Sequence, residues 1–128
     1  MLLLDTHTWL WWTSAPEQLS NAQRNALQDA SAGTLAISAI CCWEVAKLVE
    51  RGRLVRDRPV LDWVRRATDA VHILPITPEV AVRSTQFPDG FHRDPADQII
   101  VATALEQQIP LVTSDAKSLA YRHVPTIA

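Results

Sequence analysis

The first seven residues, MLLLDTH (Met1–His7), place an acid directly after a short apolar run. Three consecutive leucines at this position are typical of a strand that is buried on both faces, as in a parallel sheet. Open parallel sheets bind their ligands at the carboxyl ends of the strands. Asp5 is therefore a candidate ligand-binding residue. A simple turn residue is the alternative that this stretch alone leaves open.

Further apolar runs along the chain alternate with segments of helical periodicity. We expect strands at residues 34–38 (TLAIS), 71–76 and 110–113, and a short fifth strand at 124–127. The alternation predicts an α/β fold with a mainly parallel central sheet of four to five strands flanked by helices. At 128 residues the chain fits one domain, which we expect to span residues 1–128.

Local signals predict where several helices begin and end. Thr6 is a candidate cap for a first helix, and Ser20 with Gln23 forms a capping box for a second that runs to about residue 32 and ends at Gly33. A helix that starts near residues 57–59 should turn Leu61 and Val64 inward. A helix that opens at residues 94–97 is apolar nearly all round, which predicts that it is buried.

Composition narrows the class of protein. The net charge of −2 argues against a general polyanion binder, although a bound metal can supply positive charge that the side chains lack. The adjacent Cys41 and Cys42 are the only cysteines, so we expect no disulfide framework and a reducing compartment. The apolar run before Asp5 is too short for a signal peptide and no run is long enough to span a membrane, which together predict a cytoplasmic protein without membrane association.

Four acids occur at the same type of junction, where a strand ends or a helix begins. In an α/β sheet these junctions share one edge, so the four carboxylates should converge. Carboxylates gathered without a cation repel one another, whereas oxygen ligands of this kind suit Mg²⁺ or Mn²⁺. The predicted catalytic and metal-binding residues are Asp5, Glu44, Asp97 and Asp115.

Each acid also has a simpler interpretation. Asp94, before Pro95, is first of all a helix N-cap, with a supporting role at the site as the alternative. Asp97 could favour a helix dipole, Asp115 could be a turn or cap residue, and Glu44 could be a solvated helix acid. Small polar residues could hydrogen-bond the carboxylates or could form turns; these are Thr6, Thr113 and Ser114.

Four segments, in order and spacing, resemble the PIN-domain family and, within it, the toxins of VapBC-type toxin–antitoxin modules. They are LLLDTHTWLWW, SAICCWEVAKLVERGRL, HRDPADQIIVATAL and PLVTSD, and they extend over nearly the whole chain. The chain departs from the family at Cys41, where serine is common, and at Gln98, where arginine is common. Neither position is an acid, so the departures concern substrate contacts or packing more than metal binding.

The resemblance implies a metal-dependent ribonuclease whose acidic site is made by the four residues above. It also implies a small cognate VapB-type antitoxin as partner and a homodimer. We expect in-line attack by a metal-activated water. Asp5 and Asp97 are the residues expected to bind the metal directly, and Glu44 and Asp115 are expected either to complete the site or to hold metal-bound water.

Two rival functions stay open. A phosphohydrolase could use Asp5 as a covalent nucleophile, although that chemistry usually places a second acid where His7 stands. A non-cleaving module that only binds RNA or an antitoxin is the other, and the presence of all four acids argues against it.

Two groups of residues are candidate RNA or partner contacts. Residues 47–66 hold seven of the 12 basic residues against three acids, which is typical of a phosphate-contacting flank, a solvated helix face or a dock for an acidic segment. Three tryptophans near the amino terminus cannot all point inward from one helix, so at least one should meet a partner. The named candidates are Trp9, Trp11, Trp12, Lys47, Arg51 and Arg53.

Overall fold

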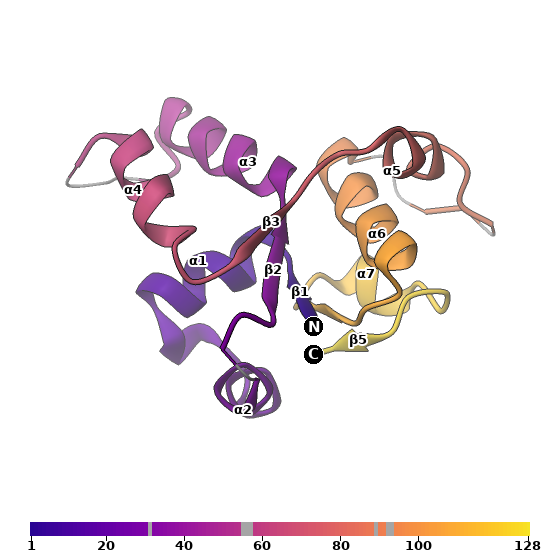
Figure 1. Cartoon of the computed structure of the whole chain (residues 1–128), viewed down its shortest axis with the longest axis horizontal. Coiled ribbons are helices and arrows are strands. Elements are labelled where there is room, and N and C mark those ends of the chain that lie inside the picture. Colours follow the sequence, from indigo (N-terminus) through magenta and orange to yellow (C-terminus); the bar gives the residue numbers. More distant parts are fainter. Residues whose placement is uncertain (31, 55–57, 89, 92–93) are drawn as a thin grey trace.

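A computed structural model describes residues 1–30, 32–54, 58–88, 90–91 and 94–128. Within these residues the chain forms five strands, seven α-helices and one 3-10 helix (Figure 1). In chain order they are β1 (Leu2–Leu4), α1 (Thr6–Ser14), η1 (Pro16–Gln18), α2 (Asn21–Asp29), β2 (Leu35–Ser38), α3 (Ala39–Glu50), α4 (Val60–Ala67), β3 (His72–Leu74), α5 (Pro78–Arg83), α6 (Pro95–Gln107), β4 (Leu111–Val112), α7 (Ala116–Ala120) and β5 (Thr126–Ile127).

The five strands form one parallel sheet in the order β3-β2-β1-β4-β5. The amino-terminal leucine run is its central strand, and Leu4 is paired with Ile37 on one side and Val112 on the other. The predicted α/β architecture and the fifth strand are confirmed. Because all strands are parallel, β1, β2 and β4 deliver the residues that follow them to the same edge of the sheet.

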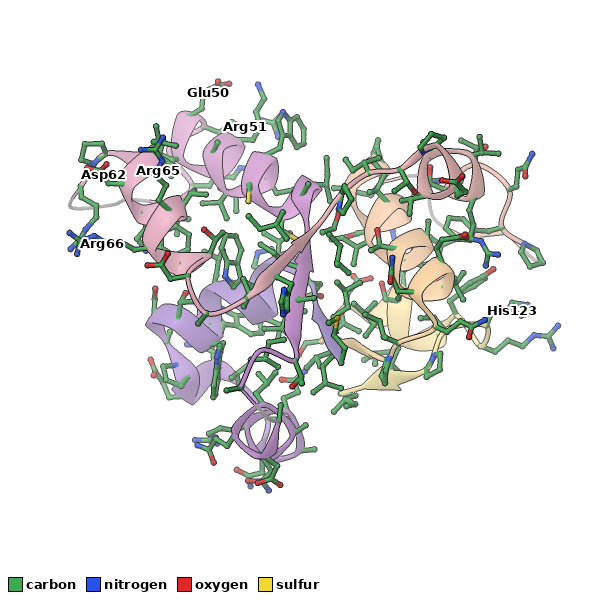
Figure 2. The ribbon with its side chains drawn as sticks, viewed as in Figure 1. Glu50, Arg51, Asp62, Arg65, Arg66 and His123 are labelled. Carbon is green, nitrogen blue, oxygen red and sulfur yellow. The ribbon has the colours of Figure 1, made fainter. Side chains whose placement is uncertain are left out.

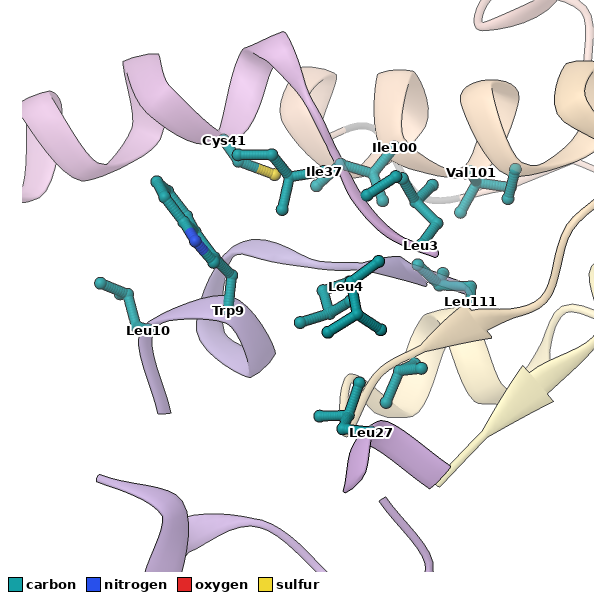
Figure 3. Packing of buried hydrophobic residues seen from close by; sticks show 14 of the residues in the cluster. Leu3, Leu4, Trp9, Leu10, Leu27, Ile37, Cys41, Ile100, Val101 and Leu111 are labelled. Atoms are coloured by element: carbon teal, nitrogen blue, oxygen red, sulfur yellow. The ribbon is translucent and has the colours of Figure 1, made fainter. Parts of the chain in front are cut away.

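The core explains why β1 is a continuous apolar run. Leu3 and Leu4 are fully buried, with Trp9 and Leu10 of α1 on one side and Ile100 and Val101 of α6 nearby (Figure 3). Helices therefore cover both faces of the sheet at β1. Side chains that point to either face are buried, so both sets must be apolar. Cys41 is fully buried in the same cluster, and both cysteines are free thiols.

The three tryptophans of α1 are divided between core and surface, as their spacing predicted. Trp9 is fully buried, its Nε1 donates to the carbonyl oxygen of Ala67 at 3.2 Å, and its ring lies 5.4 Å from that of Trp63. Trp11 and Trp12 are half-buried. Trp9 was a wrong candidate for a partner contact, because a side chain with no exposed surface cannot meet another molecule.

Three local predictions are wrong for identifiable reasons. Asp5, not Thr6, caps α1, because the helix begins one residue earlier than expected. The second helix ends at Asp29 rather than at Gly33, whose positive φ of 80° belongs to the turn before β2. Leu61 is 56% exposed, because α4 packs through Val60, Trp63, Val64 and Ala67 at helical spacing.

Other helix signals are confirmed. Ser20 and Gln23 form the predicted capping box, Thr77 caps α5 and Asp94 caps α6. The predicted start of the fourth helix near residue 57 lies outside the described residues, and the described helix begins at Val60. Among the described residues, no helix combines the length and hydrophobicity that crossing a membrane requires.

Candidate active site

Asp5 is tied to the sheet edge through both of its carboxylate oxygens. Oδ1 accepts a hydrogen bond from the backbone N–H of Thr8 at 2.9 Å, which is the N-cap of α1. Oδ2 accepts a short hydrogen bond from the hydroxyl of Thr113, which follows β4. Asp5 is therefore both a helix cap and a group held at the edge of the sheet, so the two interpretations of this residue are not exclusive.

Thr113 connects Asp5 to a second acid. Its side chain is fully buried, and its Oγ1 accepts the backbone N–H of Asp115 at 3.0 Å while donating to Asp5. Asp115 in turn caps α7, because its Oδ2 accepts the N–H and the hydroxyl of Ser118, each at 2.9 Å. One threonine hydroxyl thus fixes the relative position of the two acids that follow β1 and β4.

Glu44 projects from the second turn of α3 and is held from α1. The hydroxyl of Thr6 donates a short hydrogen bond to its Oε1. Burial raises the pKa of Glu44 and the Thr6 hydrogen bond lowers it. The negative charge of Asp94 then raises this pKa, His7 lowers it, and Asp5 raises it. The net pKa is raised, so Glu44 lies in a partly desolvated environment beside other acids.

Asp97, in the first turn of α6, carries the clearest electrostatic signature. Its pKa is raised from 3.8 to about 7, first by burial and then by nearby negative charges. Among these charges, Asp94 raises the pKa of Asp97 the most, followed by Asp115, Glu44 and Asp5. The carboxylates predicted from the sequence to converge are therefore close enough to affect one another's ionisation.

The donor set fits a hard divalent cation in its chemistry. Carboxylate oxygens are the ligands that Mg²⁺ and Mn²⁺ prefer, and a bound cation would offset the repulsion that raises the pKa of Asp97. Among the described residues, no three histidine, cysteine, aspartate or glutamate side chains already form a metal-binding group. Side chains would have to turn toward a cation for several of them to bind it together.

The remaining predicted residues take different places. Asp94 is an N-cap whose Oδ1 accepts the N–H groups of Ala96 at 3.0 Å and Asp97 at 3.1 Å. The hydroxyl of Ser114 accepts from the amide of Gln23 at 2.9 Å. Lys47 pairs with Glu50 at 3.0 Å along α3.

Two features near the acids were missed by sequence reasoning. Gln23 was recognised only as part of a capping box, yet its side chain crosses to the end of β4. Trp43 is 51% exposed beside Glu44, where a cavity of about 250 Å³ opens between α3 and the start of α6. Helical spacing identifies Trp43 as off the core stripe, but no signal in the sequence brings Gln23 to residues 90 positions away.

Comparison with known proteins agrees with this fold. The PIN domain family model matches residues 2–124, and the chain belongs to the PIN-domain family. It is 39% identical over 122 residues to ribonuclease VapC22 of Mycobacterium tuberculosis, covering 95% of this chain and 92% of that protein.

Solved structures share the fold. FitAcB from Neisseria gonorrhoeae superimposes with a TM-score of 0.72 at 22% identity, covering 100% of this chain and 97% of the other. DNA-bound VapBC from Salmonella typhimurium also gives a TM-score of 0.72, at 17% identity, with coverages of 98% and 95%. The predicted resemblance to VapC-type PIN domains is confirmed.

Proposed function

We propose that this chain is a metal-dependent endoribonuclease and the toxin of a type II toxin–antitoxin module. The observation that carries the proposal is the convergence of acids at one sheet edge, expressed in the raised pKa of Asp97. The name of the relative that is 39% identical, a ribonuclease of the VapC type, supports RNA as the substrate class. The catalytic residues would be Asp5, Glu44, Asp97 and Asp115.

Each acid would have a distinct task. Asp5 and Asp97 would bind Mg²⁺ or Mn²⁺ directly. Glu44 and Asp115 would either complete the site or hold metal-bound water. A bound divalent ion supplies an activated water and offsets negative charge on the phosphodiester. Thr113 holds the carboxylate of Asp5 and Thr6 holds that of Glu44, each by one hydrogen bond, which limits the directions that these two side chains can take.

The decisive experiment is an RNA cleavage assay on the purified chain with and without divalent metal. Cleavage should require Mg²⁺ or Mn²⁺ and stop in EDTA. Undiminished cleavage by a metal-free sample would exclude a metal-dependent reaction. Binding of RNA without cleavage would favour the non-cleaving module. Trapping a phosphoryl group on Asp5 would favour the phosphohydrolase.

A VapB-type antitoxin is the proposed protein partner. The structural neighbours include toxin–antitoxin complexes, and a cavity of about 500 Å³ between α1 and α4 is lined by aromatic and basic side chains. Trp12 and Trp63 contribute apolar surface to this cavity, and Arg66 of α4, labelled in Figure 2, also lines it. An antitoxin segment with apolar and acidic residues would suit this surface.

Tryptophan substitution tests the partner surface. Trp12→Ala should weaken antitoxin binding, by about 2 kcal/mol if it is a hot spot, as measured by calorimetric titration. Trp11→Ala tests the other half-buried tryptophan of α1, which lies outside the cavity lining. Leu61→Ala, at a 56% exposed position on α4 that is not part of the cavity lining, is the matched control. Unchanged affinity in both tryptophan variants would exclude this surface.

A homodimer is proposed as the state in solution. Ile73 on the edge strand β3, Ile76 and Val82 are large apolar side chains with 48%, 41% and 55% exposure, which suits a contact between two copies. Light scattering should give the mass of two chains for the parent. Ile76→Asp should give one, and a parent that is monomeric at all concentrations would contradict the proposal.

A further inference from the structure

Trp43 and two basic residues form one stripe along α3, beside the acids. Trp43, Lys47 and Arg51 are four residues apart, which places Trp43 and Lys47 on one face of α3 and Arg51, its C-cap, at the end of that face. The Nζ of Lys47 lies 5.9 Å from the centroid of the Trp43 ring, and the indole is 51% exposed. A helix face that presents an aromatic plane and two cations differs from the apolar face that α3 turns to the core.

The cavity next to this stripe has a divided lining. Trp43, Lys47 and Arg51 line it from α3, whereas Glu44 and Asp94 line it toward the acid site. A phosphate would be repelled by the two carboxylates but attracted by Arg51 and by Lys47, whose solvent-exposed pairing with Glu50 at 3.0 Å is of the weak surface kind. An uncharged planar group could enter between them and stack on the indole.

We infer that this cavity is a nucleobase subsite for single-stranded RNA, with one unpaired base on Trp43 and a backbone phosphate beside Lys47 and Arg51. Base–aromatic stacking tolerates any sequence because every base has a π-face, and basic residues along the helix follow the backbone. The inference rests on the proposed function, because it concerns the RNA that the acid site would cleave. It explains why a tryptophan is left exposed one residue before Glu44.

The test compares Trp43→Ala with Trp43→Phe in steady-state cleavage of a single-stranded RNA. Trp43→Ala should raise KM by about tenfold with kcat nearly unchanged, and Trp43→Phe should retain most of the affinity because it keeps an aromatic face. Fluorescence anisotropy of a labelled RNA in EDTA gives the affinity separately from cleavage. Leu61→Ala, at a 56% exposed position on α4, is the control and should change neither value.

Two results would overturn this inference. One is an unchanged RNA affinity and KM in Trp43→Ala. The other is an unchanged RNA affinity together with a weakened antitoxin complex or dimer, which would assign the surface to a protein partner. If the parent does not cleave RNA, the proposed function fails, and the anisotropy measurement still decides whether Trp43 contacts single-stranded RNA.

Gln23 carries a second, independent inference about the acid site. Its side chain is fully buried, and both ends of the amide are used. Oε1 accepts the backbone N–H of Ser20 at 3.1 Å, which completes the capping box of α2. Nε2 donates to the carbonyl oxygen of Thr113 at 3.1 Å and to the hydroxyl of Ser114 at 2.9 Å.

The residues that Gln23 holds are the ones that hold the acids. Thr113 donates to Asp5 and accepts from the N–H of Asp115, so a shift of Thr113 would move both contacts. We propose that Gln23 is a positioning residue of the acid site, acting through the turn after β4. This proposal also rests on the proposed function, since the value of fixed acids lies in the metal they would hold.

Substitution can separate the two ends of the Gln23 amide. Gln23→Glu keeps an acceptor for Ser20, because glutamate completes a capping box as well as glutamine does, but it cannot donate to Thr113 or Ser114. Gln23→Met removes the donors without burying a charge, and it also removes the oxygen that accepts the N–H of Ser20. Ser20→Ala is the opposite control, because it weakens the helix cap and leaves the bonds to the turn in place.

We expect Gln23→Glu and Gln23→Met to weaken Mn²⁺ affinity and RNA cleavage by roughly 10–100-fold, the usual effect of removing an outer partner of metal ligands. The backbone amide of Asp115 should also exchange faster with deuterium. Ser20→Ala should lower the melting temperature and leave Mn²⁺ affinity and exchange at Asp115 unchanged. Equal behaviour of all three variants in these measurements would reduce Gln23 to a helix cap and overturn the proposal. Mn²⁺ titration and exchange do not depend on RNA cleavage, so they decide even if the proposed function fails.

Discussion

The acid site is assembled from two sides that differ in construction. On the strand side, Asp5 and Asp115 each follow a parallel strand, cap the next helix and share the hydroxyl of Thr113. On the helix side, Glu44 and Asp97 belong to α3 and α6, and burial is the first cause of their raised pKa values. Hydrogen bonds from the backbone fix the first pair, whereas partial desolvation and mutual repulsion characterise the second.

This difference in construction implies that the two sides of the acid site contribute differently to metal binding. The strand side is preformed, because its carboxylate oxygens already accept peptide N–H groups whose positions the fold determines. The helix side holds unfavourable charge that a cation would stabilise. The two sides should therefore respond differently to substitution, to pH and to metal.

The largest effect is expected from Asp5→Asn on the strand side. Asparagine is as good an N-cap as aspartate, because its Oδ1 can accept the N–H of Thr8, and the Nδ2 that replaces Oδ2 can donate to Thr113 Oγ1, so the fold should be retained. Loss of the negative charge should lower RNA cleavage by more than roughly 100-fold, since even outer partners of metal ligands contribute 10–100-fold. Initial rates measure the loss of RNA cleavage, and circular dichroism shows whether the fold is retained. A folded Asp5→Asn variant that cleaves at the parent rate would remove Asp5 from the site.

The two threonines provide a direct comparison of the sides. Thr113→Val removes the hydrogen bond to Asp5 and the acceptor for the N–H of Asp115, and should reduce activity by roughly 10–100-fold. Thr6→Val removes a hydrogen bond that lowers the pKa of Glu44, so that pKa should rise further. The acid limb of the pH–rate profile should then move to higher pH. A Thr6→Val profile that coincides with that of the parent would show that Glu44 does not titrate in the reaction.

Asp97→Asn should alter how stability depends on pH in the metal-free protein. Because the pKa of Asp97 is raised from 3.8 to about 7, the folded chain keeps a proton that the unfolded chain has already released at pH values between these two. The free energy of unfolding of the parent should fall as pH rises through this window and stay low above it. Melting temperatures in EDTA should show a smaller fall for Asp97→Asn. Parallel curves for the two proteins would contradict the raised pKa.

Asp94 should give the smallest change at the site itself. Asp94→Ala should cost about 0.5–2 kcal/mol of stability through loss of the α6 cap, and Asp94→Ser should restore most of it. Activity should be nearly intact in Asp94→Ser, although removal of the negative charge should lower the pKa values of Asp97 and Glu44. Chemical denaturation and a metal titration measure these effects. Loss of metal binding at normal stability would make Asp94 a ligand.

The sequence sufficed for the parts of the molecule that local chemistry determines. The leucine run before Asp5 predicted a central parallel strand, and the Ser20–Gln23 and Asp94–Pro95 signals predicted helix starts, because caps depend on neighbouring residues. The convergence of the acids could be predicted because parallel strands end at one edge of a sheet.

The remaining features depend on contacts between distant segments. Whether Leu61 or Val60 faces the core depends on the rotation of α4 about its own axis as it packs against Trp9. A rotation equivalent to one residue exchanges the buried and the exposed position. The bond from Thr6 to Glu44 joins two helices, and that from Gln23 to Thr113 joins a helix to a strand end. Periodicity does not encode such pairings, so sequence reasoning named Thr6 and Thr113 as candidates but assigned neither a partner.

The central claim is that both sides bind one divalent cation, and Mn²⁺ titration by calorimetry in buffers of different ionisation enthalpy tests it most directly. Near pH 6.5 the carboxyl of Asp97 should be largely protonated, so binding should release a proton from it. We expect the parent to bind Mn²⁺ with proton release, Asp97→Asn to bind more weakly with less release, and Asp5→Asn to bind weakly or not at all. Mn²⁺ binding of equal strength in all three proteins, without proton release, would contradict the claim that these acids form one metal site.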